Sequence, residues 1–370
     1  MNYKGILYFL GINLLLISFF SIINIFYSIY FDFVMGLNSY LITLSLSLIL
    51  GSIFYFIGRN NNKDISLTDQ IFFILLSFIT MPFLISIPYY LSIYDIGLID
   101  AYFESVSGFT TTGFSIIYNI NYLDEPLKLW RSSSQWIGGL FFLVAIIGTI
   151  GSKQIKIKPA YLISGGASGR NFYNNFNYNF IKILLIYSAS TIFIIFLYSL
   201  ANLRLLDSVN LAFTSISAGG FIPSASLSNI LLDNLQVFVF STTLLFPIFN
   251  FFLLYDLFTR KFLLKNHYED LHLGLLVILL TLSFYFFVIP DENFVNVLLA
   301  ITSSISTSGI TTYSSNFDLS LFFILLTIVG GSLISTSSGF KYTRIYILLK
   351  ISYQEIYRLV KPINVIDKNL

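Results

Sequence analysis

Long apolar stretches alternate with short polar ones along the whole chain. Eight of these stretches approach or exceed the roughly 20 residues that a helix needs to cross the hydrocarbon core of a bilayer. They cover residues 5–30, 38–58, 70–93, 126–150, 178–201, 233–258, 273–290 and 317–352, and the last one is interrupted. This pattern predicts an all-α polytopic membrane protein.

Three further segments are only moderately apolar and are too short to span a membrane. They cover residues 99–112, 206–218 and 293–308, and each ends in a turn of small residues around a glycine: Gly113, Gly220 or Gly309. Non-helical backbone persists at membrane depth only where it lines a wet cavity or is buried in protein. We therefore interpret the three segments as re-entrant half-helices that turn back through the glycine motif.

The order of the segments predicts two N-terminal helices followed by three helix–pore loop–helix repeats. The predicted parts are a two-helix preamble over residues 1–64, then pore repeats over 65–160, 161–266 and 267–370, the last with a broken gating helix. Within the sixth apolar segment, Pro247 and Asn250 mark either a kink that faces the pore or a tolerated helix break.

Composition agrees with a membrane location. Of the 370 residues, 56% are hydrophobic and 10% are charged, whereas a soluble domain carries about 25% charged residues. The mean hydropathy is +0.81. The sequence contains no cysteine, which excludes a disulfide framework and a thiolate metal site.

The charged residues predict an orientation with the N-terminus in the cytoplasm, because Lys and Arg favour the inner loops. The predicted inner loops hold Arg59, Lys63, Lys153, Lys156, Lys158, Arg170, Arg260, Lys261, Lys265, Lys361 and Lys368. The predicted outer loops hold Asp95, Asp100, Glu104, Asp124, Glu125, Asp207, Asp291, Glu292 and Asp318, with Lys128, Arg131 and Arg204. The outer acids either steer cations to the pore or only reflect their avoidance of the inner face.

The glycine turns carry the chemistry that a dehydrated cation needs. Backbone carbonyls and Thr or Ser hydroxyls replace the oxygens of its hydration shell, and glycine permits the turn that points carbonyls at an axis. Thr110, Thr111 and Thr112 add hydroxyls beside Gly113. Small residues also pack helices closely, but three copies after three half-helix segments favour a pore.

Four stretches resemble sequence motifs of the TrkH/KtrB potassium-uptake family, and of TrkH-type members more closely. Residues 101–113 are similar to the first filter segment of the family, and residues 130–140 to the start of the next helix. Residues 330–341 are similar to its Gly-Gly-Cys-x-Gly-Ser-Thr-x-Gly-Gly-Ile-Lys motif, and residues 353–362 to the cytoplasmic stretch that follows. The two N-terminal helices also fit the TrkH type.

The resemblance implies potassium uptake through a multi-pass protein of the bacterial cytoplasmic membrane. It implies a selectivity filter that binds K⁺ at Thr111, Thr112, Gly113, Ala218, Gly219, Gly220, Thr307, Ser308 and Gly309. It implies an intramembrane gating loop with Ser335, Thr336, Ser337, Ser338, Gly339, Lys341 and Arg344. The implied partners are a peripheral nucleotide-binding subunit of the TrkA type, a second copy in a homodimer, and membrane lipid. Neither a cofactor nor a nucleic-acid partner is expected.

The gating loop departs from the family pattern, since Ile334 and Ser338 stand where the family usually has glycine. A loop with fewer glycines has less backbone freedom, so we expect altered gating. Lys341 and Arg344 either face the pore, because a cation facing lipid is costly, or snorkel to the inner headgroups. We hypothesise that a positive group below the filter acts as an electrostatic barrier that moves on gating.

The larger departure concerns length, because TrkH-like proteins close a ring with four pore repeats. Only 61 residues (370 minus 309) follow Gly309, which leaves no room for a fourth repeat. We expect either a fourth repeat on a separate chain, or a truncated gene product, or assembly with other copies. The alternative to a working pore is therefore a truncated, non-conducting or regulatory subunit.

Other function classes find less support in the sequence. His267 and His272 are predicted to be solvated residues of an inner loop, since nothing nearby completes a metal set. The glycine-rich residues 164–170 lack a Walker lysine. A membrane enzyme needs an acid or histidine cluster at one face, and none stands out, so no enzymatic activity is expected.

Overall fold

The computed structural model describes residues 2–33, 36–59, 66–93, 96–117, 119–150, 172–259, 267–290, 292–312 and 319–360. Within these ranges the regular secondary structure is entirely helical, which confirms the all-α prediction. Six helices there are long and apolar enough to cross a membrane. They are α1 (Tyr3–Tyr30), α2 (Leu37–Gly58), α3 (Leu67–Ser92), α5 (Glu125–Ile150), α7 (Phe172–Leu200) and α12 (Tyr268–Ser283), which continues into the π-helix η4 (Phe284–Val288).

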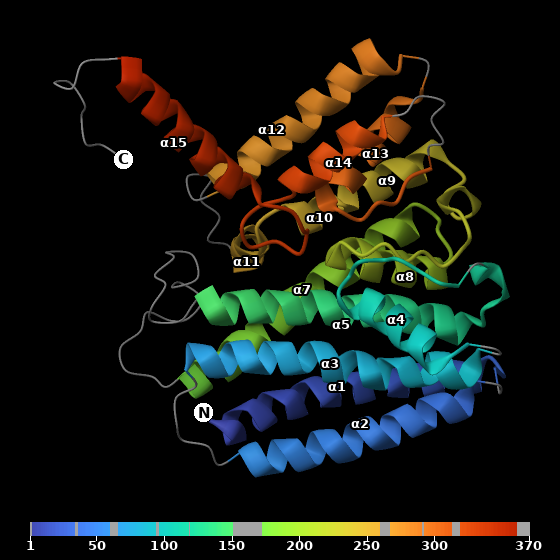
Figure 1. The fold of residues 1–370 in the computed structure, drawn as a ribbon. Helices are drawn as coiled ribbons and strands as arrows, with labels where there is room; N and C mark the ends of the chain where they lie inside the picture. The colour runs from blue at the N-terminus through green and yellow to red at the C-terminus, as the bar shows by residue number, and fades with distance from the viewer. Residues whose placement is uncertain are drawn as a thin grey trace.

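Three short helices occupy the three moderately apolar segments. These helices are α4 (Leu98–Phe109), α8 (Leu205–Ser217) and α13 (Phe294–Ser306). Each packs against neighbouring helices: α4 against α3 and α5, α8 against α5 and α7, and α13 against α9, α12 and α14. Figure 1 shows all three in the same half of the molecule. Short 3₁₀ turns, η1 (Ile120–Tyr122) and η2 (Leu227–Asn229), follow the first two.

The sixth apolar segment is not the single straight span that its hydropathy predicts. It forms α9 (Asn234–Thr243), α10 (Leu245–Ile248) and α11 (Phe251–Thr259), and the chain bends by 103° between α10 and α11. Pro247 cannot donate a helical hydrogen bond, and the following Phe249 has extended backbone. We call residues 249–250 the helix break.

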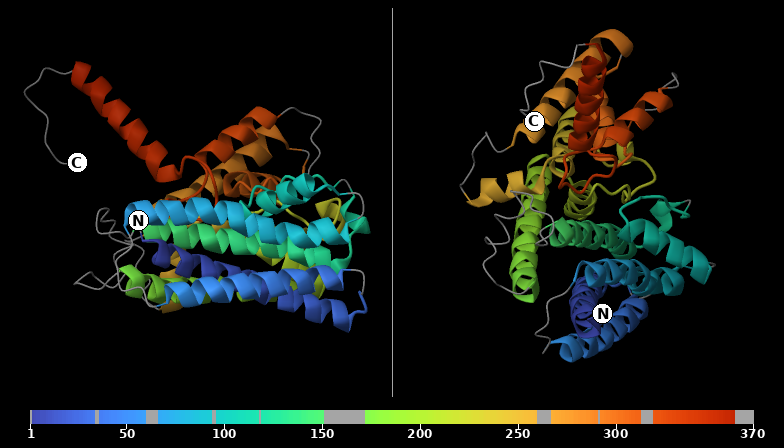
Figure 2. Two further views of the ribbon diagram at one scale, coloured as in Figure 1. Left: turned by 60° about the horizontal axis from the view of Figure 1, so that its bottom comes forward. Right: turned by 60° about the vertical axis from the view of Figure 1, so that its left-hand side comes forward.

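The eighth apolar segment is broken, as its glycine and hydroxyl residues predict. Helix α14 (Ser320–Val329) ends at Gly330, whose φ is +64°, and α15 (Tyr342–Val360) begins twelve residues later. We call residues 330–341 between these helices the gate loop. The left-hand view of Figure 2 shows α15 projecting from the helical bundle.

The apolar core falls into two clusters of buried side chains. The larger one joins α1, α3, α5, α7, α8 and α9, and the smaller one joins α12, α13 and α14. Many large apolar side chains remain exposed along α2, α7 and α12, as expected of surfaces that face hydrocarbon. The described chain is therefore a multi-pass membrane protein.

Several predicted loop residues lie outside the described residues. They are Lys63, Asp95, Lys153, Lys156, Lys158, Arg170, Arg260, Lys261, Lys265, Asp291, Asp318, Lys361 and Lys368, with the glycine-rich residues 164–170. The division of the chain at residues 64, 160 and 266 stays a prediction.

Candidate ion pathway

Each short helix is followed by a turn that has a left-handed residue at the same position. The residue two places before each turn glycine is left-handed: φ is 56° at Thr111, 57° at Ala218 and 64° at Thr307. This conformation ends a helix and is uncommon for residues other than glycine. Its occurrence at one register in all three turns shows that the predicted filter segments share a local structure.

The hydrogen bonds of the three turns also match. The amides of Thr112, Gly219 and Ser308 donate to the carbonyls of Ser107, Thr214 and Ser303, at 2.9, 2.9 and 3.1 Å. We therefore define the filter turns as residues 107–114, 214–221 and 303–310. In each filter turn, a backbone hydrogen bond between two of its own residues holds the reversal of the chain.

A hydroxyl six residues before each turn glycine adds a second bond. Ser107 Oγ donates to the Phe114 carbonyl at 2.5 Å, and Thr214 Oγ1 donates to the Phe221 carbonyl at 2.6 Å. In the third turn Ser303 Oγ instead lies 3.2 Å from Ser308 Oγ. Every filter turn begins with Ser or Thr in the sequence. We did not predict that these hydroxyls form hydrogen bonds within the turns.

The three filter turns come together in space. A Cβ on Gly113 would lie 2.5 Å from the Gly220 Cα, and a Cβ on Gly220 would lie 3.1 Å from the Ser308 carbonyl oxygen. The second turn thus touches both others, while Thr112 and Gly309 are exposed. The structure thus brings predicted filter residues from three distant parts of the chain to one place.

A buried ion pair braces the first turn from behind. Arg131 Nε donates to Glu104 Oε1 at 3.0 Å, and both side chains are almost wholly buried. The Glu104 carboxylate also accepts from the Ser115 hydroxyl and the Ile116 amide, at 2.9 and 3.1 Å. The Arg131 guanidinium lies 4.2 Å from the centroid of the Phe221 ring, so the pair reaches the second turn as well.

The predicted position of Glu104 and Arg131 in the outer loops was wrong. Sequence reasoning put Glu104 and Arg131 in the outer loops, but they lie on α4 and α5 and are buried. Glu125, another predicted outer acid, accepts hydrogen bonds from Tyr27 and Arg204. The bond to Glu125 raises the pKa of Arg204 above its ordinary value. Glu104 and Glu125, two of the acids considered for steering cations, therefore hold structure instead.

A fully buried amide supports the second turn. Gln135 Oε1 on α5 accepts from Thr214 Oγ1 at 3.2 Å and from the Phe221 amide at 3.3 Å. A Cβ on Gly219 would lie 2.3 Å from this oxygen. Gly219 is therefore needed for the approach of Gln135, and not for an unusual φ.

The gate loop lies against the C-terminal ends of two of the short helices. Thr336 Oγ1 donates to the Ile216 carbonyl of α8, and the Ser338 amide donates to Thr307 Oγ1 of the third filter turn, both at 2.9 Å. Five predicted gate residues lie within the loop: Ser335, Thr336, Ser337, Ser338 and Gly339. The structure thus brings the predicted gate into contact with the predicted filter.

The two cationic residues near the gate have different surroundings. Lys341 is buried, and its ammonium donates to the Ser335 carbonyl and hydroxyl at 3.2 and 3.0 Å and to the Ser337 carbonyl. Arg344 is exposed on the first turn of α15. The Lys341 ammonium thus binds the gate loop itself and does not reach toward the headgroups.

Ile334 and Ser338, which stand where the family motif has glycine, have backbone conformations that do not require glycine. Among the described residues of the gate loop, positive φ occurs at Gly330, Gly339 and Lys341. Ile334 and Ser338 are not among them, so neither position needs glycine. Ile334 is buried in the larger apolar cluster.

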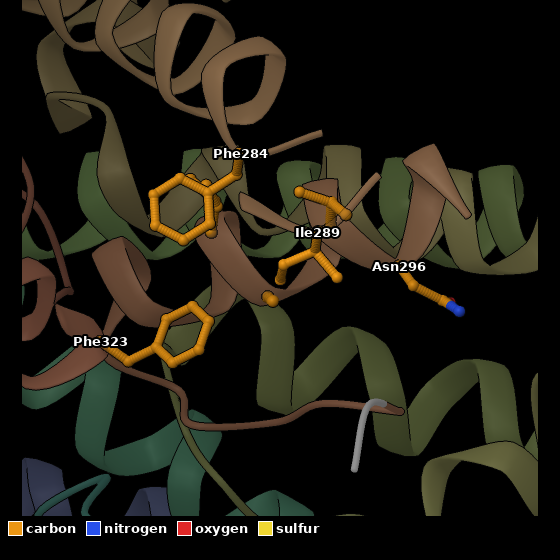
Figure 3. Close-up of a pocket in the computed structure, with 7 residues that line it drawn as sticks. Phe284, Ile289, Asn296 and Phe323 are labelled. Carbon is orange, nitrogen blue, oxygen red and sulfur yellow. The ribbon is translucent and has the colours of Figure 1, made fainter. Parts of the chain in front are cut away.

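The structure has two small pockets near the short helices α13 and α8. One is apolar and lies beside α13 in Figure 3, where the Phe284 and Phe323 rings and the Ile289 side chain converge while the Asn296 amide points away. It offers a cation no oxygen ligands. The other pocket adjoins Ser335 and Thr336 of the gate loop and is otherwise lined by apolar side chains such as Phe246 and Leu254.

The prediction for His267 was wrong. Its ring is buried, with Nε2 3.0 Å from Asp256 Oδ2 and Nδ1 3.5 Å from Asp270 Oδ2. Within the described part of the chain, no group of three or more His, Cys, Asp or Glu residues is arranged to hold a metal ion.

Two known transport proteins are similar to this chain in sequence. An uncharacterised cation transporter of Methanocaldococcus jannaschii is 28% identical over 97% of this chain and 74% of its own length. The Trk system potassium uptake protein TrkH of Halomonas elongata is 26% identical over 99% of this chain and 79% of its own length. No family profile matches the chain.

The fold is also similar to that of a potassium transporter of known structure. The crystal structure of the potassium transporter TrkH from Vibrio parahaemolyticus superposes with a TM-score of 0.79 at 23% identity, over 99% of this chain and 79% of that one. The chain is thus similar in sequence to TrkH-type potassium uptake proteins and shares the fold of TrkH. The resemblance to the TrkH/KtrB family that the sequence indicated is thereby confirmed, and the absence of a fourth repeat stays a prediction.

Proposed function

We propose that this TrkH relative carries potassium ions across a membrane as the pore-forming subunit of a Trk-type uptake system. The observation that carries the proposal is the meeting of three filter turns with one hydrogen-bond pattern at Gly113, Gly220 and Ser308. The names of the relatives, Trk potassium uptake proteins, support potassium as the transported ion.

The chemistry follows from the direction of the short helices. Helices α4, α8 and α13 all end at the filter turns, and the C-terminal end of a helix carries a partial negative charge of about half an electron. Carbonyls and hydroxyls of Thr111–Gly113, Ala218–Gly220 and Thr307–Gly309 then supply oxygen ligands in place of water. The gate loop below them controls access from the other side.

The finer parts of the proposal concern partners and location. We expect the bacterial cytoplasmic membrane, a cytoplasmic N-terminus, a nucleotide-binding subunit of the TrkA type on the inner face, and a homodimer. The protein is expected to need no cofactor and to catalyse no chemical reaction. A non-conducting role is the less favoured alternative.

The test is ion flux through the purified protein in liposomes. Liposomes loaded with KCl should take up ⁸⁶Rb⁺, a tracer for K⁺, and excess external K⁺ should compete better than Na⁺. The matched control is G220A, which crowds the Gly113 and Ser308 backbones and should abolish uptake. Flux that G220A leaves unchanged, or no flux with and without a TrkA-type subunit, would contradict the proposal.

A further inference from the structure

Helix α12 begins with two adjacent carboxylates, Glu269 and Asp270, that hold two different broken helices. Each carboxylate accepts a backbone amide from a chain break: Glu269 from the gate loop and Asp270 from the helix break. Neither residue belongs to the filter or the gate loop. Their role is therefore not explained by the pathway described so far.

Glu269 fastens the gate loop at both of its ends. Its Oε1 accepts from the Leu333 amide at 2.9 Å and from the Thr343 hydroxyl. Leu333 lies near the start of the loop, and Thr343 lies in the first turn of α15. Hydrogen bonds to an ionised carboxylate are stronger than those between neutral groups, so one oxygen ties both flanks of the loop to α12.

Asp270 fixes the neighbouring break. Its side chain is buried, and Oδ1 accepts from the Asn250 amide at 2.6 Å. The other oxygen lies 3.5 Å from His267 Nδ1, and His267 in turn contacts Asp256 on α11. The 103° bend is thus held from α12.

The gate loop rests on this bend through three backbone hydrogen bonds. The Ser332 amide donates to the Ile248 carbonyl at 2.8 Å, and the Ser337 amide donates to the Pro247 carbonyl at 3.1 Å. In the other direction, the Phe251 amide donates to the Ile334 carbonyl at 2.7 Å. The two breaks form one unit, and α12 holds it from the side away from the filter.

The loop is therefore fastened on two sides. Toward the filter it bonds to Ile216 and Thr307, and on the other side it bonds to Glu269. Movement of the loop away from the filter turns must change the geometry at Leu333. The hydrogen bond between the Leu333 amide and Glu269 then either breaks, or the Glu269 side chain moves together with the loop.

We propose that Glu269 is a positioning residue of the gate, whose carboxylate fastens the gate loop beneath the filter turns and releases Leu333 when the loop moves. The term gate rests on the proposed function, but the fastening of the loop does not. Asp270 holds the support on which the fastened loop rests.

The test measures loop exposure without relying on ion flux. The chain has no native cysteine, so S332C supplies one thiol at a fully buried loop position whose hydroxyl makes no hydrogen bond within the described residues. Its reaction rate with a charged methanethiosulfonate reagent in detergent reports release of the loop. The same rate is measured in S332C combined with E269A, E269Q or T343V.

The modification rate of S332C is expected to rise with the number of hydrogen bonds to Glu269 that a variant loses. E269A should raise the rate about tenfold, and E269Q and T343V by a smaller factor, because E269A removes both hydrogen bonds, T343V removes one of them, and E269Q keeps an acceptor without the charge. The matched control is E355Q, an exposed carboxylate of α15 that bonds only to Arg358 in the described residues, and it should leave the rate unchanged. If E269A fails to fold, E269Q and T343V decide.

The outcomes separate this inference from the proposed function. Unchanged rates in folded E269Q and T343V overturn the positioning role, even if the wild-type protein carries potassium. Faster modification in these variants supports the role, even if no variant carries potassium, and only the proposed function then fails.

Discussion

At the scale of single residues, the filter turns depend on side chains that stand behind them. Glu104 and Arg131 form an almost wholly buried pair whose remaining bonds go to Ser115 and the Ile116 amide. Burying two charges costs more than their attraction returns unless hydrogen bonds satisfy them. The pair is therefore better explained by fixing the backbone after Gly113 than by stability alone.

Removing one member of this pair should be costly. We expect E104Q to lower the free energy of unfolding by about 3 kcal/mol, because it leaves Arg131 buried without a counter-charge. Thermal unfolding in detergent measures the loss, and the K⁺ over Na⁺ preference of uptake should fall with it. The matched control is E355Q, which breaks an exposed pair and should cost less than about 1 kcal/mol. Equal effects of the two variants would contradict the bracing role.

Two filter glycines separate crowding from backbone strain. Gly113 and Gly309 both have positive φ, but only at Gly113 would a Cβ clash, since nothing in the described residues lies within 4 Å of one at Gly309. We expect G113A to abolish ⁸⁶Rb⁺ uptake and G309A to reduce it only partly, for a strain of roughly 1 to 2 kcal/mol. Similar uptake by the two variants would show that the turns do not need to touch.

At the scale of elements, the gate loop and α15 form one continuous unit. Lys341 holds the loop internally through Ser335 and Ser337, and Arg344 follows on the exposed face of α15. The two cations therefore divide the roles that the sequence left open for both. The hydrogen bonds of Lys341 favour a structural role for it, and Arg344 is the better candidate for an electrostatic barrier.

Neutralising Arg344 should raise leak flux of ⁸⁶Rb⁺ in liposomes. We expect R344Q to increase the leak several-fold in dilute salt, and the increase should shrink near 1 M salt, where the screening length falls from about 10 Å to about 3 Å. R358Q, at the far end of the same helix, serves as the control and should not change the leak. A leak that R344Q leaves unchanged at both salt concentrations would exclude the barrier.

At the scale of the whole molecule, the three filter turns must enter the membrane from one side. The positive-inside pattern predicts that this is the outer side. Exposed serines test the prediction, because the chain has no native cysteine. Ser228 lies between α8 and α9 on the predicted outer side, and Ser352 lies on α15 on the predicted inner side.

In intact cells, S228C should react with a membrane-impermeant thiol reagent, and S352C should react only after the membrane is permeabilised. Labelling is read by a mass shift on a gel, and the cysteine-free wild type provides the background. The reverse pattern would mean that the chain inserts with its N-terminus outside and that the acids mark the inner mouth.

The periodicity and the glycine turns predicted most of the long helices and the three short helices that end in turns, because both signals are local. Helix length follows from apolar run length, and a turn follows from small residues after a short helix. The fate of residues 233–258 was not predictable in the same way. Pro247 permits a helix to bend, but the 103° angle depends on Asp270 and the gate loop, which lie far away in the sequence.

The sequence by itself determined the membrane class, the turns after the three short helices, the broken last helix and the resemblance to TrkH-type proteins, since each depends on hydropathy, turn chemistry or motifs along the chain. Only the tertiary structure decided which charges are buried. Glu104, Arg131 and His267 have ordinary loop or helix-end surroundings in sequence, and their partners lie on other helices. Burial and pairing are properties of packing between distant segments, so no local pattern encodes them.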